Sequence, residues 1–253
     1  MKDVHSRHVG REIRVAWAIT SKDMRTYYTQ PPSIMFGILF PFTLFLAFTI
    51  GRNLPLAVQI PILISQTLFF ASSSIGPVVI PLERADQTFD RFLTSPVSLL
   101  SILMGKTLGG IIYGAGISVI PVLVGIFVFG SQITNLVALI ACFALSSLAF
   151  SALGILFASI PGQTVGQVMM PLNFVRIPLL FISGVFTPIG QLPAWMQAVS
   201  FLSPLTHTVG LASYASGGET FFGPILNVMV LGAYAAAFVF VSIRFNIMNL
   251  RKH

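Results

Sequence analysis

The chain of 253 residues is 55% hydrophobic and only 8% charged, whereas soluble globular domains carry roughly 25% charged residues. Several windows of about 20 residues lack charge, and such a window is long enough to cross the roughly 30 Å hydrocarbon core of a bilayer. The length alone would fit one or two soluble domains, but the composition excludes them and predicts an all-α integral membrane protein.

The formal net charge of +7 comes from 14 Lys and Arg residues against 7 Asp and Glu residues. Basic residues cluster before the first apolar run and after the last one, at Lys2, Arg7, Arg11, Arg14, Lys22, Arg25, Arg244, Arg251 and Lys252. This distribution follows the positive-inside rule of membrane proteins and argues against a nucleic-acid partner.

The single cysteine, Cys142, lies in an apolar run. It excludes an intrachain disulfide and a cysteine-rich metal site, and we predict no metal. We also expect no cleaved signal peptide, because the first apolar run begins near residue 33, after a long charged segment, and is too long for a signal sequence.

Residues 8–29 predict an amphipathic helix that lies on the cytoplasmic membrane surface. Apolar or weakly polar side chains recur there at steps of three or four, at Val9, Ile13, Trp17, Thr20, Met24 and Tyr28. Charged residues fill much of the rest of the helical wheel. The alternative is an ordinary soluble helix that packs on another domain. Pro31 and Pro32 then break the helix and let the chain turn into the bilayer.

Six membrane spans follow, at about 33–51, 57–81, 99–129, 135–160, 166–187 and 223–244. With a cytoplasmic N-terminus, all Lys and Arg residues except Arg52 and Arg176 lie on the cytoplasmic side, counting Lys106 at its membrane edge. The reversed topology fits far worse. We therefore expect a multi-pass protein of the cytoplasmic membrane with both termini inside. It comprises an N-terminal region over 1–32, a six-span domain over 33–244 and a tail over 245–253.

The third span contains pairs of glycines spaced four apart, Gly105 with Gly109 and Gly110 with Gly114. Small residues at this spacing let helices approach closely in lipid. We favour packing within the chain, and the alternative is a seam between two copies.

A compact charged segment, "ERADQTFDRFLTSPVS", links the second and third spans over residues 83–98. A helix over 82–95 would have one apolar stripe, and its other faces would carry Glu83, Arg84, Asp86, Asp90 and Arg91. Pro96 ends this helix, because proline disfavours helix at the residue before it. We predict a short two-faced helix on the cytoplasmic side, and the alternative is a solvated connector.

The outer segment over 188–222 is too long for a plain turn and contains no Lys or Arg. "PAWMQAVSFLSP" predicts a short helix with Pro193 near its start and with Trp195, Val199 and Leu202 on one face. Because this segment is so apolar, we expect it to re-enter the outer leaflet as half-helices that are surrounded by protein.

Arg176 is the one basic residue expected deep within a span, and Asn173 lies three residues before it on the same helix face. Permanent charge in a membrane is expensive, so this face should meet protein or water. A role in the translocation path or at a dimer seam is one reading. Snorkelling or a structural hydrogen bond is the other.

Several kinds of chemistry are absent from the sequence. There is no phosphate loop of the G-x-x-x-x-G-K-[ST] type for ATP and no hydrolase motif. No acidic residue is placed mid-span, which argues against an ion-coupled carrier, although unwound backbone is another way to bind Na⁺. We therefore expect no enzyme activity in this chain and an energy source in another polypeptide.

The order of these features resembles the type-2 ABC-transporter permeases, a group that includes daunorubicin-resistance-type, nodulation-factor and polysaccharide exporters. The charged segment over residues 83–98 is the connector between the second and third spans. It is similar to a family pattern of Gly-Thr-Leu-Glu followed by Thr-Pro-Val-Ser, with Gln87 in place of the usual glycine. The outer segment matches a second pattern at Ser183, Gly184, Pro188, Leu192, Pro193, Pro204 and Leu205. Many members carry an Asp and an Arg shortly afterwards, where Gly210 and Ser213 stand here.

The resemblance implies a half-permease that pairs with a second copy or a homologous permease, above two ABC ATPase subunits. ATP and Mg²⁺ would be bound by those partners, with no cofactor in this chain. The connector would be the coupling helix, with Phe89 and Phe92 as apolar anchors and its charged residues as polar contacts. Candidate residues of an outer gate are Pro188, Pro193, Trp195, Pro204 and His207, although His207 is more simply explained as structural.

The function expected from these features is ATP-driven export of an amphiphilic drug, lipid or glycolipid-like substrate by alternating access. Two alternatives remain, a self-sufficient channel or ion-coupled carrier, and a membrane scaffold that transports nothing.

Overall fold

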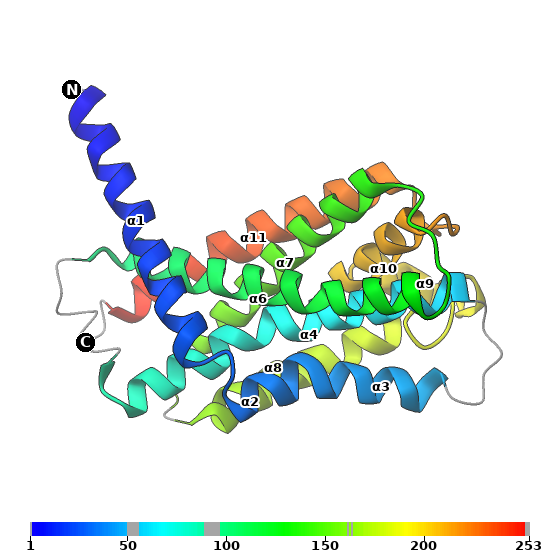
Figure 1. Cartoon of the computed structure of the whole chain (residues 1–253), viewed down its shortest axis with the longest axis horizontal. Coiled ribbons are helices and arrows are strands. Elements are labelled where there is room, and N and C mark those ends of the chain that lie inside the picture. Colours follow the sequence, from blue (N-terminus) through cyan, green and yellow to red (C-terminus); the bar gives the residue numbers. More distant parts are fainter. Residues whose placement is uncertain (1, 50–55, 89–96, 161, 163, 251–253) are drawn as a thin grey trace.

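The computed structural model describes residues 2–49, 56–88, 97–160, 162 and 164–250. These residues form helices joined by turns, and no strand occurs among them. The long helices lie side by side in a bundle, and α1 leaves the bundle at one end (Figure 1). Within the described residues, five helices are long and apolar enough to cross a membrane, and a bent pair of helices raises that number to six. The chain is therefore a multi-pass membrane protein.

The last five predicted spans each correspond to one helix. These are α4 (Leu56–Ala85), α6 (Leu99–Phe127), α7 (Leu136–Ala158), α8 (Val165–Ile182) and α11 (Pro224–Leu250). The first predicted span is divided into α2 (Pro31–Ile34), a π-helical turn (Met35–Leu39) and α3 (Phe40–Thr49).

Local side-chain chemistry explains where several helices begin. The side chains of Ser98 and Asn135 accept hydrogen bonds from backbone N–H groups in the first turns of α6 and α7. Thr164 and Gln167 form a reciprocal capping box at the start of α8. Such caps satisfy N–H groups that have no partner within the helix.

Helix α4 is the centre of the bundle. All residues of its most apolar window are buried inside the chain, compared with 22% for α11 and 28% for α8. It packs against α3, α6, α7, α8 and α10. Helices α8 and α11 therefore direct most of their apolar surface away from the chain, toward lipid or a partner.

Helix α1 (Lys2–Thr26) turns sharply into the first span. The described part of α1 and the helix that begins at Pro31 are bent by 94° relative to each other. Proline at the first helical position is favourable there, because its missing N–H would have no partner anyway. The two prolines therefore start the next helix as well as ending the previous one.

The predicted apolar stripe of α1 packs on the bundle only in part. Ile13 and Trp17 remain more than half exposed, whereas Ala16, Ile19 and Thr20 are buried against the rest of the chain. These three residues pack on the bundle because α6 approaches α1 closely at Gly105, where a Cβ atom would lie 2.8 Å from the Ala16 carbonyl oxygen.

The ends of the helices gather at two poles of the bundle. The end of α4, the start of α6 and the end of α11 lie at the pole from which α1 leaves (Figure 1). The opposite pole carries α9 (Ala194–Phe201) and α10 (Pro204–Ala215). The predicted short helix after Pro193 is thus present, and its insertion into the outer leaflet stays a prediction.

Candidate functional site

A buried cluster of charged side chains joins α1, α4 and α6. Lys106 Nζ on α6 lies 2.6 Å from Asp23 Oδ2 on α1 and 2.7 Å from Glu83 Oε1 near the end of α4. Lys22 completes the cluster, with Nζ 3.2 Å from Asp23 Oδ1 and a second ion pair to Glu83. The side chains of Lys106, Asp23 and Glu83 are at most 1% exposed.

Such burial is tolerated only because opposite charges face one another. Removing a charge from water costs several kcal/mol, which close pairing with good geometry can offset. Burial raises the pKa of Asp23, the neighbouring Glu83 carboxylate acts in the same direction, and the ammonium groups of Lys106 and Lys22 oppose both. The cluster fixes α1 against the point where α4 ends.

Two further contacts tie α1 to the start of α6. The Thr20 hydroxyl donates to the Gly105 carbonyl oxygen at 2.8 Å. Glu12 accepts hydrogen bonds from Ser98 and Ser101, the residues at the beginning of α6. Helix α1 is therefore attached to α6 by contacts that are distributed over several of its turns.

The last turn of α4 also caps a neighbouring helix. Arg84 donates to the carbonyl oxygens of Ala158, Ile160 and Gly162 at 3.1–3.3 Å, at the end of α7. Carbonyl groups at a helix end lack partners within the helix, and a cation there also meets the negative end of the helix dipole. Arg84 thereby links the connector to a second span.

The connector departs from α4 through an unusual backbone conformation. Gln87 has φ of 55°, which makes it the one residue other than glycine with positive φ in the described chain. Glycine adopts this region without a steric penalty. The glycine that the family pattern places here is thus the residue that suits this geometry best, and Gln87 adopts it at a cost.

The predicted partner-contact residues are in three different situations. Asp86 is exposed, whereas Glu83 is fully buried and Arg84 is half-buried and hydrogen-bonded within the chain. The partner contact of Glu83 stays a prediction, and in this structure its buried side chain meets Lys22 and Lys106 of the same chain. The predicted helix over 82–95 begins as the last turn of α4 instead of a separate element. Phe89, Asp90, Arg91 and Phe92 lie outside the described residues.

The four glycines of the two spaced pairs in the third span face neighbours within the chain. A Cβ on Gly105 would meet α1, one on Gly109 would lie 2.7 Å from the Tyr28 hydroxyl, and one on Gly110 would lie 2.8 Å from the Ser72 carbonyl oxygen. A Cβ on Gly114 would lie 2.9 Å from the Cα atom of Ser72. These glycines allow α6 to approach α1 and α4 closely.

Arg176 is sealed inside the bundle. One terminal nitrogen donates to the hydroxyls of Ser73 at 2.6 Å and Ser74 at 3.1 Å, and the other lies 3.3 Å from Asn173 Oδ1. The guanidinium also lies over the Phe70 ring at 5.3 Å. Asn173 and Arg176 do share a face, as their spacing indicates, and that face meets the central helix α4. In this conformation the Arg176 side chain is fully buried.

The predicted outer-gate residues lie on different sides of the outer segment. Pro188, Pro193 and Trp195 are exposed, and Pro204 is buried at the first position of α10. His207 is fully buried, with Nδ1 2.8 Å from Asn227 Oδ1 and Nε2 2.9 Å from the Phe201 carbonyl oxygen. Its position indicates a structural link between α9, α10 and α11.

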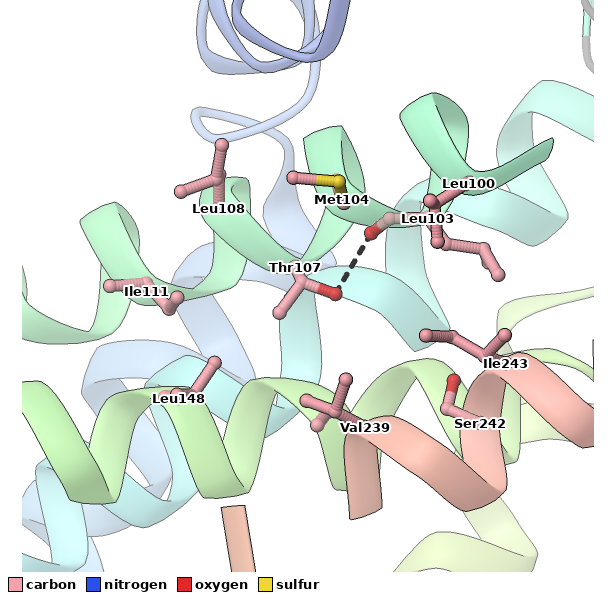
Figure 2. A pocket seen from close by; sticks show the side chains of 11 residues that line it. Leu100, Leu103, Met104, Thr107, Leu108, Ile111, Leu148, Val239, Ser242 and Ile243 are labelled. Atoms are coloured by element: carbon pink, nitrogen blue, oxygen red, sulfur yellow. Dashed lines mark hydrogen bonds between the residues drawn. The ribbon is translucent and has the colours of Figure 1, made fainter. Parts of the chain in front are cut away.

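An apolar groove of about 190 Å³ lies between α6, α7 and α11 (Figure 2). Leucines, isoleucines and Met104 form most of its wall, and the Thr107 hydroxyl that points there already donates to the Leu103 carbonyl oxygen at 2.8 Å. The groove therefore fits hydrocarbon and offers little for polar recognition.

Sequence reasoning missed the charge cluster. Lys106 was assigned to the membrane edge, and Asp23 and Lys22 were assigned to the polar face of a surface helix. The available signal was Lys106 itself, because a charged residue inside an apolar span predicts a buried partner. The two carboxylates that pair with it come from different, distant segments, and sequence spacing does not connect them.

Comparisons with known proteins agree with the resemblance. The profile of the family described as ABC-2 type transporter matches residues 14–216. The chain is 24% identical over 152 residues to the probable multidrug ABC transporter permease YbhR of Escherichia coli, covering 58% of this chain and 40% of the relative.

Two other relatives match at similar levels. Nodulation protein J of Rhizobium meliloti is 25% identical over 163 residues, covering 63% of this chain and 60% of the relative. The daunorubicin resistance ABC transporter permease protein DrrB1 of Streptomyces coeruleorubidus is 29% identical over 153 residues, with coverages of 57% and 52%. The chain thus matches between two fifths and three fifths of the length of these relatives. Because the family profile covers most of the chain, including the charge cluster and most of the outer segment, the chain belongs to the ABC-2 type transporter family.

Proposed function

We propose that the chain is the transmembrane subunit of an ATP-driven exporter, which moves an amphiphilic drug, lipid or glycolipid-like molecule across the cytoplasmic membrane. Two permease chains, either identical or homologous, form the translocation unit. Separate ABC ATPase subunits bind ATP and Mg²⁺ and supply the energy. The pole that carries α1, the end of α4 and the end of α11 faces the cytoplasm.

The observation that carries this proposal is the construction of that pole. Helix α4 runs through the centre of the bundle and ends at a charged connector. At that end, Lys106 fastens Glu83 of α4 to Asp23 of α1. A force applied to the connector therefore acts on the central helix and on the surface helix together, as coupling to a partner beneath the membrane requires.

The exposed side of α1 suits the membrane surface. Ile13, Trp17 and Met24 remain exposed, and Arg11, Arg14 and Arg25 are exposed along the same helix. Apolar and aromatic side chains with flanking basic residues favour the boundary between hydrocarbon and anionic head groups. Helix α1 lies along that boundary and rises or tilts with the connector when the ATPases close.

The substrate class follows from the polarity of the bundle. Apart from the charge cluster, the buried polar groups of the described spans are mostly serine hydroxyls, with Gln66, Arg176 and Asn227 among the exceptions, and the groove between α6, α7 and α11 has an aliphatic wall. Such surfaces suit molecules with a large apolar part better than free sugars or ions. The substrate is exposed alternately to the two sides of the membrane as the two permease chains rearrange.

The test is capture of an ATPase by the full chain. The tagged chain is co-expressed with the ABC ATPase encoded beside it and purified in mild detergent. We expect ATPase at one copy per permease chain. Charge reversal at the exposed connector residue, Asp86→Lys, is expected to reduce capture about tenfold, because it replaces an attractive charge with a repulsive one at a contact. The matched control is Gly223→Asp, at an exposed position near the opposite pole where an added Cβ meets no atom within 4 Å.

Two results would overturn the proposal. If no ATPase is captured and the chain alone in liposomes passes substrate without ATP, the chain is a channel or a self-sufficient carrier. If ATPase is captured but Asp86→Lys changes neither capture nor ATP-dependent export, the connector does not couple the two subunits.

A further inference from the structure

A cavity of about 280 Å³ opens at the pole opposite α1. Five segments form it, namely α4, the turn after α8, α10, the loop before α11, and α11 itself. Its apolar wall is made by Ile62, Ile189 and Val209, and its polar groups come from Thr206, Ser213, Glu219, Thr220 and Asn227. The cavity thus combines an aliphatic side with convergent oxygen atoms, which is the usual composition of a small-molecule site.

The cavity has a net negative character. Glu219 is exposed and lines it, and the sequence contains no other Asp or Glu after Asp90. No Lys or Arg occurs between Arg176 and Arg244. The nearby His207 is fully buried and its ring nitrogens face Asn227 and Phe201. A positively charged ligand therefore meets one carboxylate and no competing ammonium or guanidinium group from this segment.

The floor of the cavity carries a polar group that has no partner. Thr206 is 1% exposed, and its hydroxyl makes no hydrogen bond within the described chain. A buried hydroxyl without a partner costs free energy, so a ligand atom that accepts or donates there is favoured. Asn227 stands beside it with its amide already used, because Nδ2 donates to Thr220 Oγ1 and to the Phe222 carbonyl oxygen at 3.1 Å.

Aromatic side chains complete the mouth of the cavity. Phe221 is 55% exposed and packs edge-on against Phe222, with ring centroids 5.0 Å apart. Both belong to the loop that carries Glu219 and both line the cavity. A ring face next to a carboxylate attracts an alkylammonium group through both its quadrupole and the neighbouring charge.

We propose that this cavity binds the cationic head group of an amphiphile, with Glu219 as counter-ion, Phe221 as a cation–π partner and Thr206 as a polar contact at the floor. The inference rests on the proposed export function and deepens it by naming a class of substrate, amphiphilic cations, and the place where the head group is held at the outer pole. The apolar wall receives the first part of the hydrocarbon portion.

Gly210 controls how much room the site has. A Cβ at this position would lie 2.6 Å from Asn227 Nδ2 and 2.9 Å from Thr220 Oγ1. Any side chain there would disturb the hydrogen bond that holds the loop before α11. Gly210 and the small Ser213 both line the cavity and leave room for a ligand there.

The experiment measures ligand binding by the full chain alone, in nanodiscs of phosphatidylcholine, by saturation-transfer NMR and calorimetry. The probes are benzyltrimethylammonium and an anion of similar size, phenylmethanesulfonate. We expect the cation to bind in preference to the anion. Glu219→Gln is expected to weaken cation binding about tenfold, because it removes the one counter-charge without changing the size of the side chain.

Three further variants locate the site. Glu219→Asp keeps the charge and is expected to retain the preference for the cation. Phe221→Leu keeps an apolar side chain and is expected to weaken binding about threefold, as loss of a cation–π contact would. Ser213→Leu fills the cavity and is expected to abolish binding. Glu219 and Phe221 are exposed, so unchanged melting temperatures are expected for their variants.

Equal binding of cation and anion, or unchanged cation binding by Glu219→Gln, would overturn the inference. The outcome is independent of ATPase capture, since no ATPase is present in the binding experiment. Cation binding without ATPase capture would support the site and reject the exporter function. ATPase capture without cation binding would support the exporter function and reject the site.

Discussion

Lys106 lies between two carboxylates in a space closed to water. Replacing it by methionine keeps the apolar stem of the side chain but leaves Asp23 and Glu83 facing each other with only Lys22 nearby. Breaking a buried ion pair by removing one partner costs about 3–5 kcal/mol. We expect Lys106→Met to lower the free energy of unfolding by this amount, measured by denaturation in detergent.

Lys22→Met is the matched control, because its side chain is 37% exposed. Water screens a charge in such a position, and exposed ion pairs contribute about 0–1 kcal/mol. Equal losses of stability in the two variants would show that the cluster is not the closed pair of contacts described above.

Asp23 makes stability depend on pH. Because burial raises its pKa above the ordinary value of 3.8, the folded chain holds this proton more tightly than the unfolded chain does. Stability from this group is fully present below about pH 4 and is lost as the pH rises through the raised pKa. We expect the melting temperature of the wild type to fall over this range relative to that of Asp23→Asn. Parallel melting curves for the two proteins from pH 4 to 8 would contradict this assignment.

Gln87 carries a backbone cost that glycine would remove. A side chain in the left-handed region costs about 1–2 kcal/mol, and glycine relieves most of it at a helix end. We expect Gln87→Gly to stabilise the chain by about 0.5–1 kcal/mol. The control is Ala85→Gly, two residues earlier and still helical, which should destabilise the chain by about 1 kcal/mol. Thermal unfolding of both variants in detergent checks the opposite signs.

At the scale of elements, the cost of adding a side chain to a glycine of α6 depends on whether that glycine faces another helix. A Cβ on Gly114 would lie 2.9 Å from the Cα atom of Ser72, whereas one on Gly116 meets no atom within 4 Å. Gly114→Ala is therefore expected to cost about 1–3 kcal/mol by forcing α6 away from α4. Gly116→Ala should be neutral or stabilise the helix by up to about 1 kcal/mol. Similar melting temperatures for the two variants would show that α6 does not pack on α4 through this face.

The helices were predictable and their contacts were not. The starting positions of α6, α8 and α9 follow from Ser98, Thr164 and Pro193, which are local signals in the sequence. The packing face of α1 follows from periodicity only at Thr20, because the close approach of α6 at Gly105 buries Ala16 and Ile19 and leaves Ile13 and Trp17 exposed. For the same reason, the pairing of Asp23 with Lys106 depends on tertiary approach, and no spacing within either segment reveals it.

At the scale of the whole molecule, the two poles are expected to face opposite sides of the membrane. Cys142 is fully buried, and replacing it by alanine gives a background without cysteine. In this background we expect Asp86→Cys to react with a membrane-impermeant maleimide only in inside-out vesicles. Gly223→Cys should react only in right-side-out vesicles. Labelling of both positions from one side would exclude the proposed orientation.

The central position of α4 connects these poles. Among the described helices, α4 alone contributes both to the charge cluster, through Glu83, and to the outer cavity, through Ile62. Ile62 and Glu83 are 21 positions apart along α4, which corresponds to about 30 Å of helix. Neighbouring helices surround α4 over that length, and hydrogen bonds of Arg84 with the end of α7 and of Arg176 with Ser73 and Ser74 tie it to two of them. A displacement of the connector would then reach the wall of the outer cavity through one helix, which contains Pro77 and Pro81 on the way. Ligand binding at one surface and partner contact at the other would thus be linked through a single helix.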